Sequence, residues 1–286
     1  IKKRQISMLA AMAMVLATIV LPATALGKGG GKGRSAAWSD GAAQRKADYV
    51  YMEAMRQNAL ENDDAYFELL RGSRDLDSTD TQPGLTLGYF YMALGQEDTL
   101  LAARGYEMMR RHFNAHPSDY YSSIFYGMVN SQLGNTDEAI RVWSALSRRY
   151  PEKPDVALKL AQSLQQSADS ANLRRSVVVL DSIERAEGKD LGLTSAKIHA
   201  FMSLRDTAAT YGELSSLLES SKSNAPNNLY AGDVFMVMGK PDSAIAYYNR
   251  ACDIDPTNGL AYYKRAEFYR ERGDSVGFDR QVFQAV

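Results

Sequence analysis

The stretch SQLGNTDEAIRVWSALSRRYPEKP, residues 131–154, contains a spacing of small, aromatic and proline residues that decides the fold. The stretch MGKPDSAIAYYNRACDIDP, residues 238–256, repeats this spacing. Successive landmarks are five, four and eight residues apart in both stretches: Gly134, Ala139, Trp143 and Pro151 in the first, Gly239, Ala244, Tyr248 and Pro256 in the second. Two copies about a hundred residues apart indicate a repeated structural unit.

The spacing predicts the second helix of a helix pair. Ala139 and Trp143 lie four residues apart, which places them on one helical face. The small residue lets a neighbouring helix approach closely, and the aromatic ring fills the space beside it. Gly134 ends the preceding helix, and Pro151 prevents the second helix from continuing. No single pair can bury its apolar face alone, so successive pairs must stack.

Seven units with a small residue at the eighth position of their first helix span the body of the chain. We place their starts at residues 47, 81, 120, 154, 193, 225 and 259, so three of the six steps are 34 residues long. The second and fourth steps are 39 residues long, which predicts an added helical turn or a longer loop in those units. The small residues are Ala54, Gly88, Gly127, Ala161, Ala200, Gly232 and Ala266.

This pattern resembles the tetratricopeptide repeat (TPR), a 34-residue unit of two antiparallel helices. The resemblance covers residues 44–286 and is most specific in the third and sixth units. It implies an all-α fold, an α-solenoid of about seven antiparallel helix pairs that forms a right-handed superhelix.

Recurring Asp-Ser/Thr-apolar triplets resemble the O-glycosylation acceptor motif of exported proteins from Bacteroides-like bacteria. Asp98-Thr99-Leu100 and Asp274-Ser275-Val276 are two of them. Several triplets fall at expected helix starts, where capping by the Asp or Ser side chain explains them without modification. We favour the capping interpretation, and the resemblance to an exported, Bacteroides-like type of TPR protein remains an expectation.

The first 25 residues have the order of regions found in a secretory signal peptide. A basic cluster precedes an apolar run that ends near Leu21, and Ala23 and Ala25 form a cleavage-site pattern. An uncleaved signal anchor is the alternative. Residues 26–43 are rich in glycine, which predicts a flexible linker. The signal-peptide pattern predicts an exported protein that is periplasmic or associated with the cell envelope. No cysteine directly follows the apolar run, so we do not expect a lipoprotein. We expect contact with a membrane only if the leader stays uncleaved.

Charge and composition limit the possible partners. The 286 residues include 33 Lys and Arg and 34 Asp and Glu, a formal net charge of -1. Six basic and no acidic residues lie in the first 34 positions, so the remainder has 27 basic against 34 acidic side chains, a net charge of -7. An acidic body disfavours binding to nucleic acid. Cys252 is the single cysteine, which excludes an intrachain disulfide and a Cys-based zinc site.

Residue types that support catalysis or metal binding form no recognisable motif. His112 and His116 are four residues apart without a His-Glu-x-x-His pattern, and we interpret them as solvated side chains at a helix C-terminus. We interpret His199 as packed or half-buried, and Cys252 as a small buried apolar group. Gly-x-Ser-x-Gly is absent. We therefore predict no enzyme, with no catalytic residue, cofactor or metal.

The resemblance implies that ligands lie along a concave groove lined by positions 2, 5, 9, 12 and 13 of each first helix. Tyrosine and methionine suit an adaptable groove for protein or peptide, whereas packing between units is the alternative use of these aromatics. A Lys/Asn/Arg clamp, which chaperone-binding relatives use, is absent. The predicted partner-binding residues are Tyr51, Met55, Asn58, Leu85, Tyr89, Tyr121, Met128, Gln132, Gln162, Gln165, Gln166, Tyr263, Glu267 and Arg270.

These observations favour a non-enzymatic protein- or peptide-binding scaffold or adaptor in the bacterial cell envelope. One alternative is a structural component of an envelope assembly that stacks through an apolar C-terminal end containing Phe278 and Phe283. Another is an accessory module of a polysaccharide-handling complex, in which carbohydrate stacks on the tyrosines. The sequence leaves the partner and the oligomeric state open.

Overall fold

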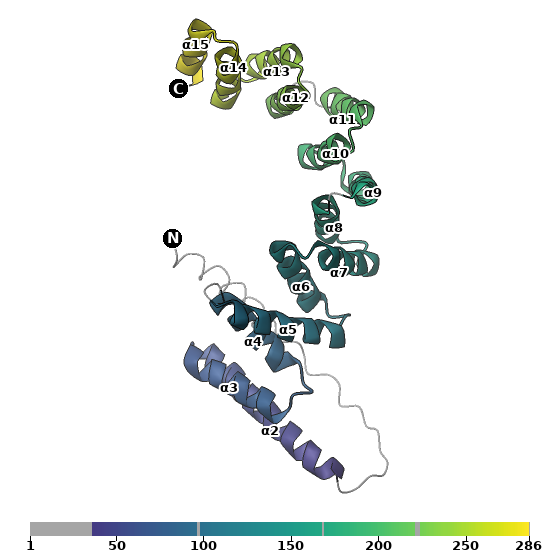
Figure 1. Ribbon diagram of the computed structural model, residues 1–286, viewed down its shortest axis with the longest axis vertical. Helices are drawn as coiled ribbons and strands as arrows, with labels where there is room; N and C mark the ends of the chain where they lie inside the picture. Colours follow the sequence, from purple (N-terminus) through teal and green to yellow (C-terminus); the bar gives the residue numbers. More distant parts are fainter. Residues whose placement is uncertain (1–35, 96–97, 168, 221–223, 286) are drawn as a thin grey trace. The chain divides into compact units, whose positions relative to one another are not determined.

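The computed structural model describes residues 36–95, 98–167, 169–220 and 224–285, and the regular structure within these ranges is entirely α-helical (Figure 1). The helices follow one another as seven consecutive pairs, which confirms the all-α fold built from helix pairs. The pairs are α2 (Ala36–Ala59) with α3 (Asp63–Leu76), α4 (Gln82–Leu94) with α5 (Thr99–Ala115), α6 (Tyr120–Leu133) with α7 (Thr136–Arg149), α8 (Pro154–Gln166) with α9 (Ser170–Glu187), α10 (Leu191–Ser203) with α11 (Thr207–Ser220), α12 (Ala225–Val237) with α13 (Pro241–Ile254), and α14 (Gly259–Glu271) with α15 (Ser275–Ala285).

The first helices begin where the repeat register places them. In six of the seven pairs, the first helix starts within two residues of the predicted unit start. The exception is α2, which begins at Ala36, so residues 36–43 are helical rather than part of the predicted linker 26–43. The predicted leader, residues 1–25, and the rest of that linker lie outside the described residues.

The two long steps of the repeat arise from longer second helices. α5 has 17 residues and α9 has 18, whereas α7, α11 and α13 have 14 each. The sequence had left an added helical turn and a longer loop as alternatives, and the structure selects the added turn. The extra turn of α9 contains Glu184, whose carboxylate contacts Lys197 of the next helix pair.

The seven small residues at position eight of the first helices are all buried, as predicted. The sixth pair shows why they must be small. A Cβ atom added at Gly232 would lie 2.3 Å from Cε1 of Tyr248, far closer than two carbon atoms can approach. Tyr248 and Ala244 of α13 are themselves buried against α12. The landmark residues therefore serve packing within a pair.

Side-chain caps and glycines define the helix ends. Gly134 ends α6 with φ +74°, and Gly239 and Gly273 end first helices with similar positive φ. That left-handed backbone conformation costs glycine little. Asp98 accepts hydrogen bonds from the backbone N–H groups of Leu100 and Leu101, and Asp169, Asp206 and Asp274 cap α9, α11 and α15 in the same manner. The sequence contains six Asp-Ser/Thr-apolar triplets, and capping explains the four that begin at these aspartates.

The described residues divide into two compact units, one that ends at Val142 and one that begins at Trp143, and the division falls within α7. In the N-terminal unit, Ala54, Tyr66, Leu70 and Leu87 belong to a core formed by α2, α3 and α4, with Met108 of α5. The C-terminal unit has a small core around Leu180 and a larger one, formed by α10 to α14, that includes Tyr248 and Cys252.

Candidate functional site

Half of the eight predicted groove residues in the N-terminal unit contribute to packing. Leu85 and Tyr89 of α4 are buried, and the Tyr89 ring meets Phe125 of α6 edge-on at a centroid distance of 4.2 Å. Tyr51 and Met55 of α2 are half-buried against the core of their pair. Burial also raises the pKa of the Tyr51 and Tyr89 hydroxyls above the ordinary value. These side chains therefore pack within the fold, which was the alternative to binding a partner.

Two predicted residues of the N-terminal unit are open to a partner. Tyr121 at the start of α6 and Gln132 near its end are exposed. Tyr121 rests edge-on against Tyr120, with ring centroids 5.4 Å apart. Asn58 of α2 and Met128 of α6 are half-buried. The eight predicted residues of this unit therefore do not form one accessible strip.

The C-terminal unit places its predicted residues in two groups. Gln162 and Gln166 of α8 are exposed, but Gln165 donates from Nε2 to the backbone oxygen of Ala196, at 2.9 Å, and so joins α8 to α10. Gln165 is consequently a packing residue.

The second group, Tyr263, Glu267 and Arg270 of α14, is brought together on one helical face. The Tyr263 hydroxyl donates to Oε1 of Glu267 at 3.0 Å, and Arg270 Nη2 lies 3.5 Å from the same oxygen. The Tyr263 side chain remains 49% exposed.

Residues that the sequence analysis missed extend this group onto α12. Asp233 of α12 accepts a hydrogen bond from the Tyr248 hydroxyl at 2.8 Å, and its Oδ1 lies 3.1 Å from Nζ of Lys264 on α14. Asp233 thereby links three helices. Val237 and Leu260 are exposed apolar side chains on α12 and α14. Asp233, Val237, Leu260, Tyr263, Glu267 and Arg270 together are called the α12–α14 face.

The repeat register supplied the signal for these missed residues. Asp233 occupies position nine of the sixth unit, the same position as Tyr89, Gln162 and Glu267 in other units, and Leu260 occupies position two of the seventh. Applying the groove positions to every unit would have found both. It would also have selected Lys197, at position five of the fifth unit, and the structure shows a different role for that residue.

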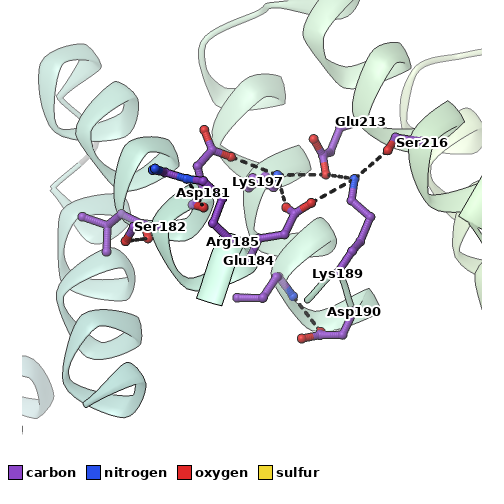
Figure 2. Close-up of polar contacts among 11 residues, drawn as sticks. Asp181, Ser182, Glu184, Arg185, Lys189, Asp190, Lys197, Glu213 and Ser216 are labelled. Carbon is purple, nitrogen blue, oxygen red and sulfur yellow. Dashed lines mark hydrogen bonds and ion pairs between the residues drawn. The ribbon is translucent and has the colours of Figure 1, made fainter. Parts of the chain in front are cut away.

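Lys197 is the centre of a buried ionic cluster that joins α9, α10 and α11 (Figure 2). Its side chain is 5% exposed. Its Nζ lies 3.0 Å from Asp181, 3.1 Å from Glu213, and also contacts Glu184. Lys189, in the turn before α10, pairs with Glu213 at 2.7 Å and with Glu184 at 3.5 Å. These five side chains, from two successive helix pairs, are called the Lys197 cluster.

The protonation of the Lys197 cluster follows from these contacts. Burial alone would lower the pKa of Lys197, but hydrogen bonds to Glu184, Asp181 and Glu213 raise it above its ordinary value. Burial would likewise raise the pKa of Glu184, and the two lysines hold it below its ordinary value. Lys197 and Glu184 therefore stay charged at neutral pH, and the cluster links the fourth helix pair to the fifth.

Two of the three histidines, His112 and His199, differ from expectation, whereas His116 is solvent-exposed as predicted. His112 is buried, not solvated, and its Nδ1 lies 3.1 Å from the hydroxyl of Thr81 at the start of α4. Burial, with a contribution from His116, lowers the pKa of His112. The reason is the longer α5, whose last turn packs its inner face against α4. His116 is exposed, and so is His199, which was predicted to be packed.

No group of three or more His, Cys, Asp or Glu side chains in the described ranges could hold a metal ion. Cys252 is buried as a free thiol, as predicted. None of the helices between residues 36 and 285 that the structure describes is both long and apolar enough to cross a membrane.

Helix pairs in this register, each with a buried small residue on its first helix, define the chain as an all-α helical-repeat protein. A family model described as TPR repeat matches residues 232–273, from the eighth position of the sixth unit through the first helix of the seventh. The chain therefore contains a match to the TPR repeat in this region and has the helical-repeat fold of TPR proteins. A comparison with curated protein sequences finds no match.

Solved structures with this fold include a tetratricopeptide repeat protein from Parabacteroides merdae. It is 11% identical to this chain, with a TM-score of 0.51, over 84% of this chain and 92% of that one. MamA from Desulfovibrio magneticus RS-1 is 13% identical, with a TM-score of 0.41, over 57% and 90%. YrrB, described as a TPR protein with an unusual peptide-binding site, is 11% identical, with a TM-score of 0.38, over 62% and 90%. TPR proteins are generally non-enzymatic scaffolds for protein interaction.

Proposed function

We propose that this protein is a binding scaffold that holds a protein or peptide partner on its first helices, with the α12–α14 face as the principal contact. The observation that carries the proposal is the combination of exposed apolar side chains and pre-positioned charges on that face. Leu260 and Tyr263 supply apolar area, while Asp233, Glu267 and Arg270 are held in fixed positions by neighbouring side chains. Such side chains lose little conformational freedom on binding.

The finer proposal places this scaffold in the bacterial cell envelope. It is supported by the signal-peptide order of residues 1–25 and by the acidic body, which suits a protein or peptide partner better than a nucleic acid. Intact-mass measurement of the protein recovered from an envelope fraction tests this directly. A mature chain that begins after Ala25 is the expected result, and recovery of the protein only from the cytoplasmic fraction would contradict the proposal.

Affinity capture with matched variants tests the binding proposal. The tagged chain is cross-linked in cells, and its partners are quantified by mass spectrometry for the wild type and for Tyr263→Ala/Arg270→Ala. A control variant, Arg174→Ala, changes an exposed side chain of α9 away from the face. We expect the double variant to lose most of the captured partner and the control to retain it. Equal capture by all three proteins would contradict the assignment of the α12–α14 face.

One observation favours a second candidate function, a structural part of an envelope assembly. Val276 and Phe283 of α15 are exposed, and Phe283 is 86% exposed. Phe278 is half-buried, so it contributes less to this surface than the sequence analysis expected. Sedimentation analysis of the wild type and of Phe283→Ser separates the two candidates. Concentration-dependent self-association that Phe283→Ser removes would favour the assembly role.

A further inference from the structure

The C-terminal unit contains an open pocket that none of the predicted groove residues lines. It lies between α11, α12 and α13 and has a volume of ≈ 520 Å³. Seven of its eight lining residues belong to the second helices α11 and α13, and Asn228 of α12 is the eighth. The groove positions, in contrast, belong to first helices. The pocket is therefore a separate surface from the α12–α14 face.

The walls of the pocket are apolar and fixed in place. Leu218 of α11 and Ile254 of α13 line it together with Tyr247. The Tyr247 ring is stacked on Phe235 of α12, with centroids 5.1 Å apart and an angle of 8° between the ring planes. This stacking holds the tyrosine side chain against α12. An aliphatic ligand group would thus meet preformed walls and not a collapsed surface.

The lining of the pocket contains two carboxylates and one guanidinium, a formal net charge of -1. Glu219 of α11 and Asp253 of α13 are exposed at the rim, and neither forms an ion pair with another described residue. Asn228, at the floor, is buried, and its Nδ2 already donates to the backbone oxygen of Asn224 at 2.9 Å. The one cation of the lining, Arg250, has its guanidinium 5.1 Å from the centroid of the Tyr247 ring.

We propose that this pocket binds a lysine or arginine side chain of a basic peptide segment in a partner protein. Such a side chain combines an aliphatic stem with a cationic head. The stem fits against Leu218, Ile254 and Tyr247, and the head lies between the carboxylates of Glu219 and Asp253. The guanidinium of Arg250, which rests on the aromatic ring, is left to donate to a backbone carbonyl of the same peptide.

The lining of the pocket distinguishes a basic side chain from an aliphatic or an acidic one. A purely aliphatic side chain satisfies the walls but leaves both rim carboxylates without a partner. An acidic side chain is repelled by them. Two exposed ion pairs, each of modest strength, predict that a lysine side chain binds about five-fold more tightly than an uncharged side chain of the same length.

Methyl NMR of the full chain tests the proposal, because Leu218 and Ile254 report from inside the pocket. The probes are three acetylated and amidated pentapeptides, Gly-Ala-X-Ala-Gly, with X as lysine, norleucine or glutamate. Titration of the lysine peptide should shift the methyl signals of Leu218 and Ile254, with an affinity about five-fold above that of the norleucine peptide and with no binding by the glutamate peptide.

Two charge-neutralising variants make the test specific. Glu219→Gln/Asp253→Asn should reduce the affinity for the lysine peptide to that for norleucine. Glu187→Gln/Asp279→Asn removes the same charge from exposed positions outside the pocket and should leave the five-fold preference intact. Methyl signals that stay unchanged for residues away from the substituted positions show that the free variants are folded.

Equal affinity for lysine and norleucine in the wild type would overturn the proposal. So would a lysine preference that survives in Glu219→Gln/Asp253→Asn or disappears in the control variant. Either result would leave the proposed scaffold function untouched, since Tyr263→Ala/Arg270→Ala does not alter the pocket lining.

Discussion

Removing the charge of Lys197 should loosen α10 from its neighbours on both sides. In Lys197→Met the side chain keeps most of its length and apolar volume, so the loss is mainly electrostatic. The buried ammonium contacts carboxylates of α9 and α11, and these contacts join the fourth helix pair to the fifth. The variant therefore tests whether the Lys197 cluster holds the two pairs together.

The structure sets the magnitude of the effect. Breaking a buried ion pair costs about 3–5 kcal/mol when the remaining charge is left uncompensated. Here Asp181 is 47% exposed and can be solvated, and Lys189 still pairs with Glu213 at 2.7 Å. We therefore expect about 2–3 kcal/mol for Lys197→Met, at and below the lower end of that range.

Hydrogen exchange measured by mass spectrometry is the appropriate assay because repeat arrays open locally and need not unfold in one step. A loss of 2–3 kcal/mol corresponds to exchange that is about 30–150-fold faster in peptides from α10. Adding Glu184→Gln should restore part of the protection, because without Lys197 this carboxylate keeps only the longer 3.5 Å contact with Lys189. Lys159→Met, which changes an exposed lysine of α8, should stay within about 0.5 kcal/mol of the wild type.

The pH dependence provides an independent check on the same cluster. The pKa of Glu184 lies below its ordinary value of 4.5 in the folded state. Its contribution to stability is therefore fully present above pH 4.5 and is lost as the pH falls through the folded-state pKa. The linking role of the cluster is refuted if hydrogen exchange in α10 of Lys197→Met stays within about threefold of the wild-type rate at both neutral and acidic pH. The Lys197 cluster would then not hold the two helix pairs together.

Three further predictions concern packing, pH and backbone conformation. Gly232→Ala should lower the free energy of unfolding by about 1–3 kcal/mol, measured by thermal denaturation, because the added Cβ would overlap the Tyr248 ring. Gly84→Ala has no atom within 4 Å of the added Cβ, so it should be neutral or stabilising by about 0.5–1 kcal/mol. The N-terminal unit should lose stability as the pH falls below 6.5 and through the lowered pKa of His112, and His112→Leu should abolish this slope in urea titrations followed by circular dichroism. Gly134→Ala, at φ +74°, should lower stability by about 1 kcal/mol, and an unchanged melting temperature would show that the turn relaxes without strain.

Local spacing was sufficient to predict the helix pairs. Small residues at position eight must be buried wherever two helices approach closely, so the periodic spacing of Ala54, Gly232 and their equivalents reports directly on packing. The extra length of α5 and α9 was visible as steps of 39 residues. The close approach of two helices requires a small residue at a fixed position of each unit, so the spacing in the sequence and the observed helix pairs agree.

The surface could be predicted less well because it depends on which helices meet. Tyr89 has the same groove position as Gln162, yet it is buried because Phe125 of the following first helix covers it. His112 is buried because the last turn of a long α5 reaches Thr81. In each case the deciding neighbour is more than 30 residues distant, and repeat position alone carries no information about it.

The same reasoning explains why the first-helix surface of the C-terminal unit is discontinuous. Position five of the fifth unit holds Lys197, whose charge is compensated by α9 and α11 and is withdrawn from solvent. Gln165, in the preceding helix pair, donates a hydrogen bond from its side-chain amide to the backbone of α10. The Lys197 ammonium and the Gln165 amide thus form contacts between helix pairs and do not face a partner. Polar groups positioned to face a partner remain on either side, at Gln162 and Gln166 of α8 and on the α12–α14 face, so a long ligand would be recognised at two separated places and a short one at a single place.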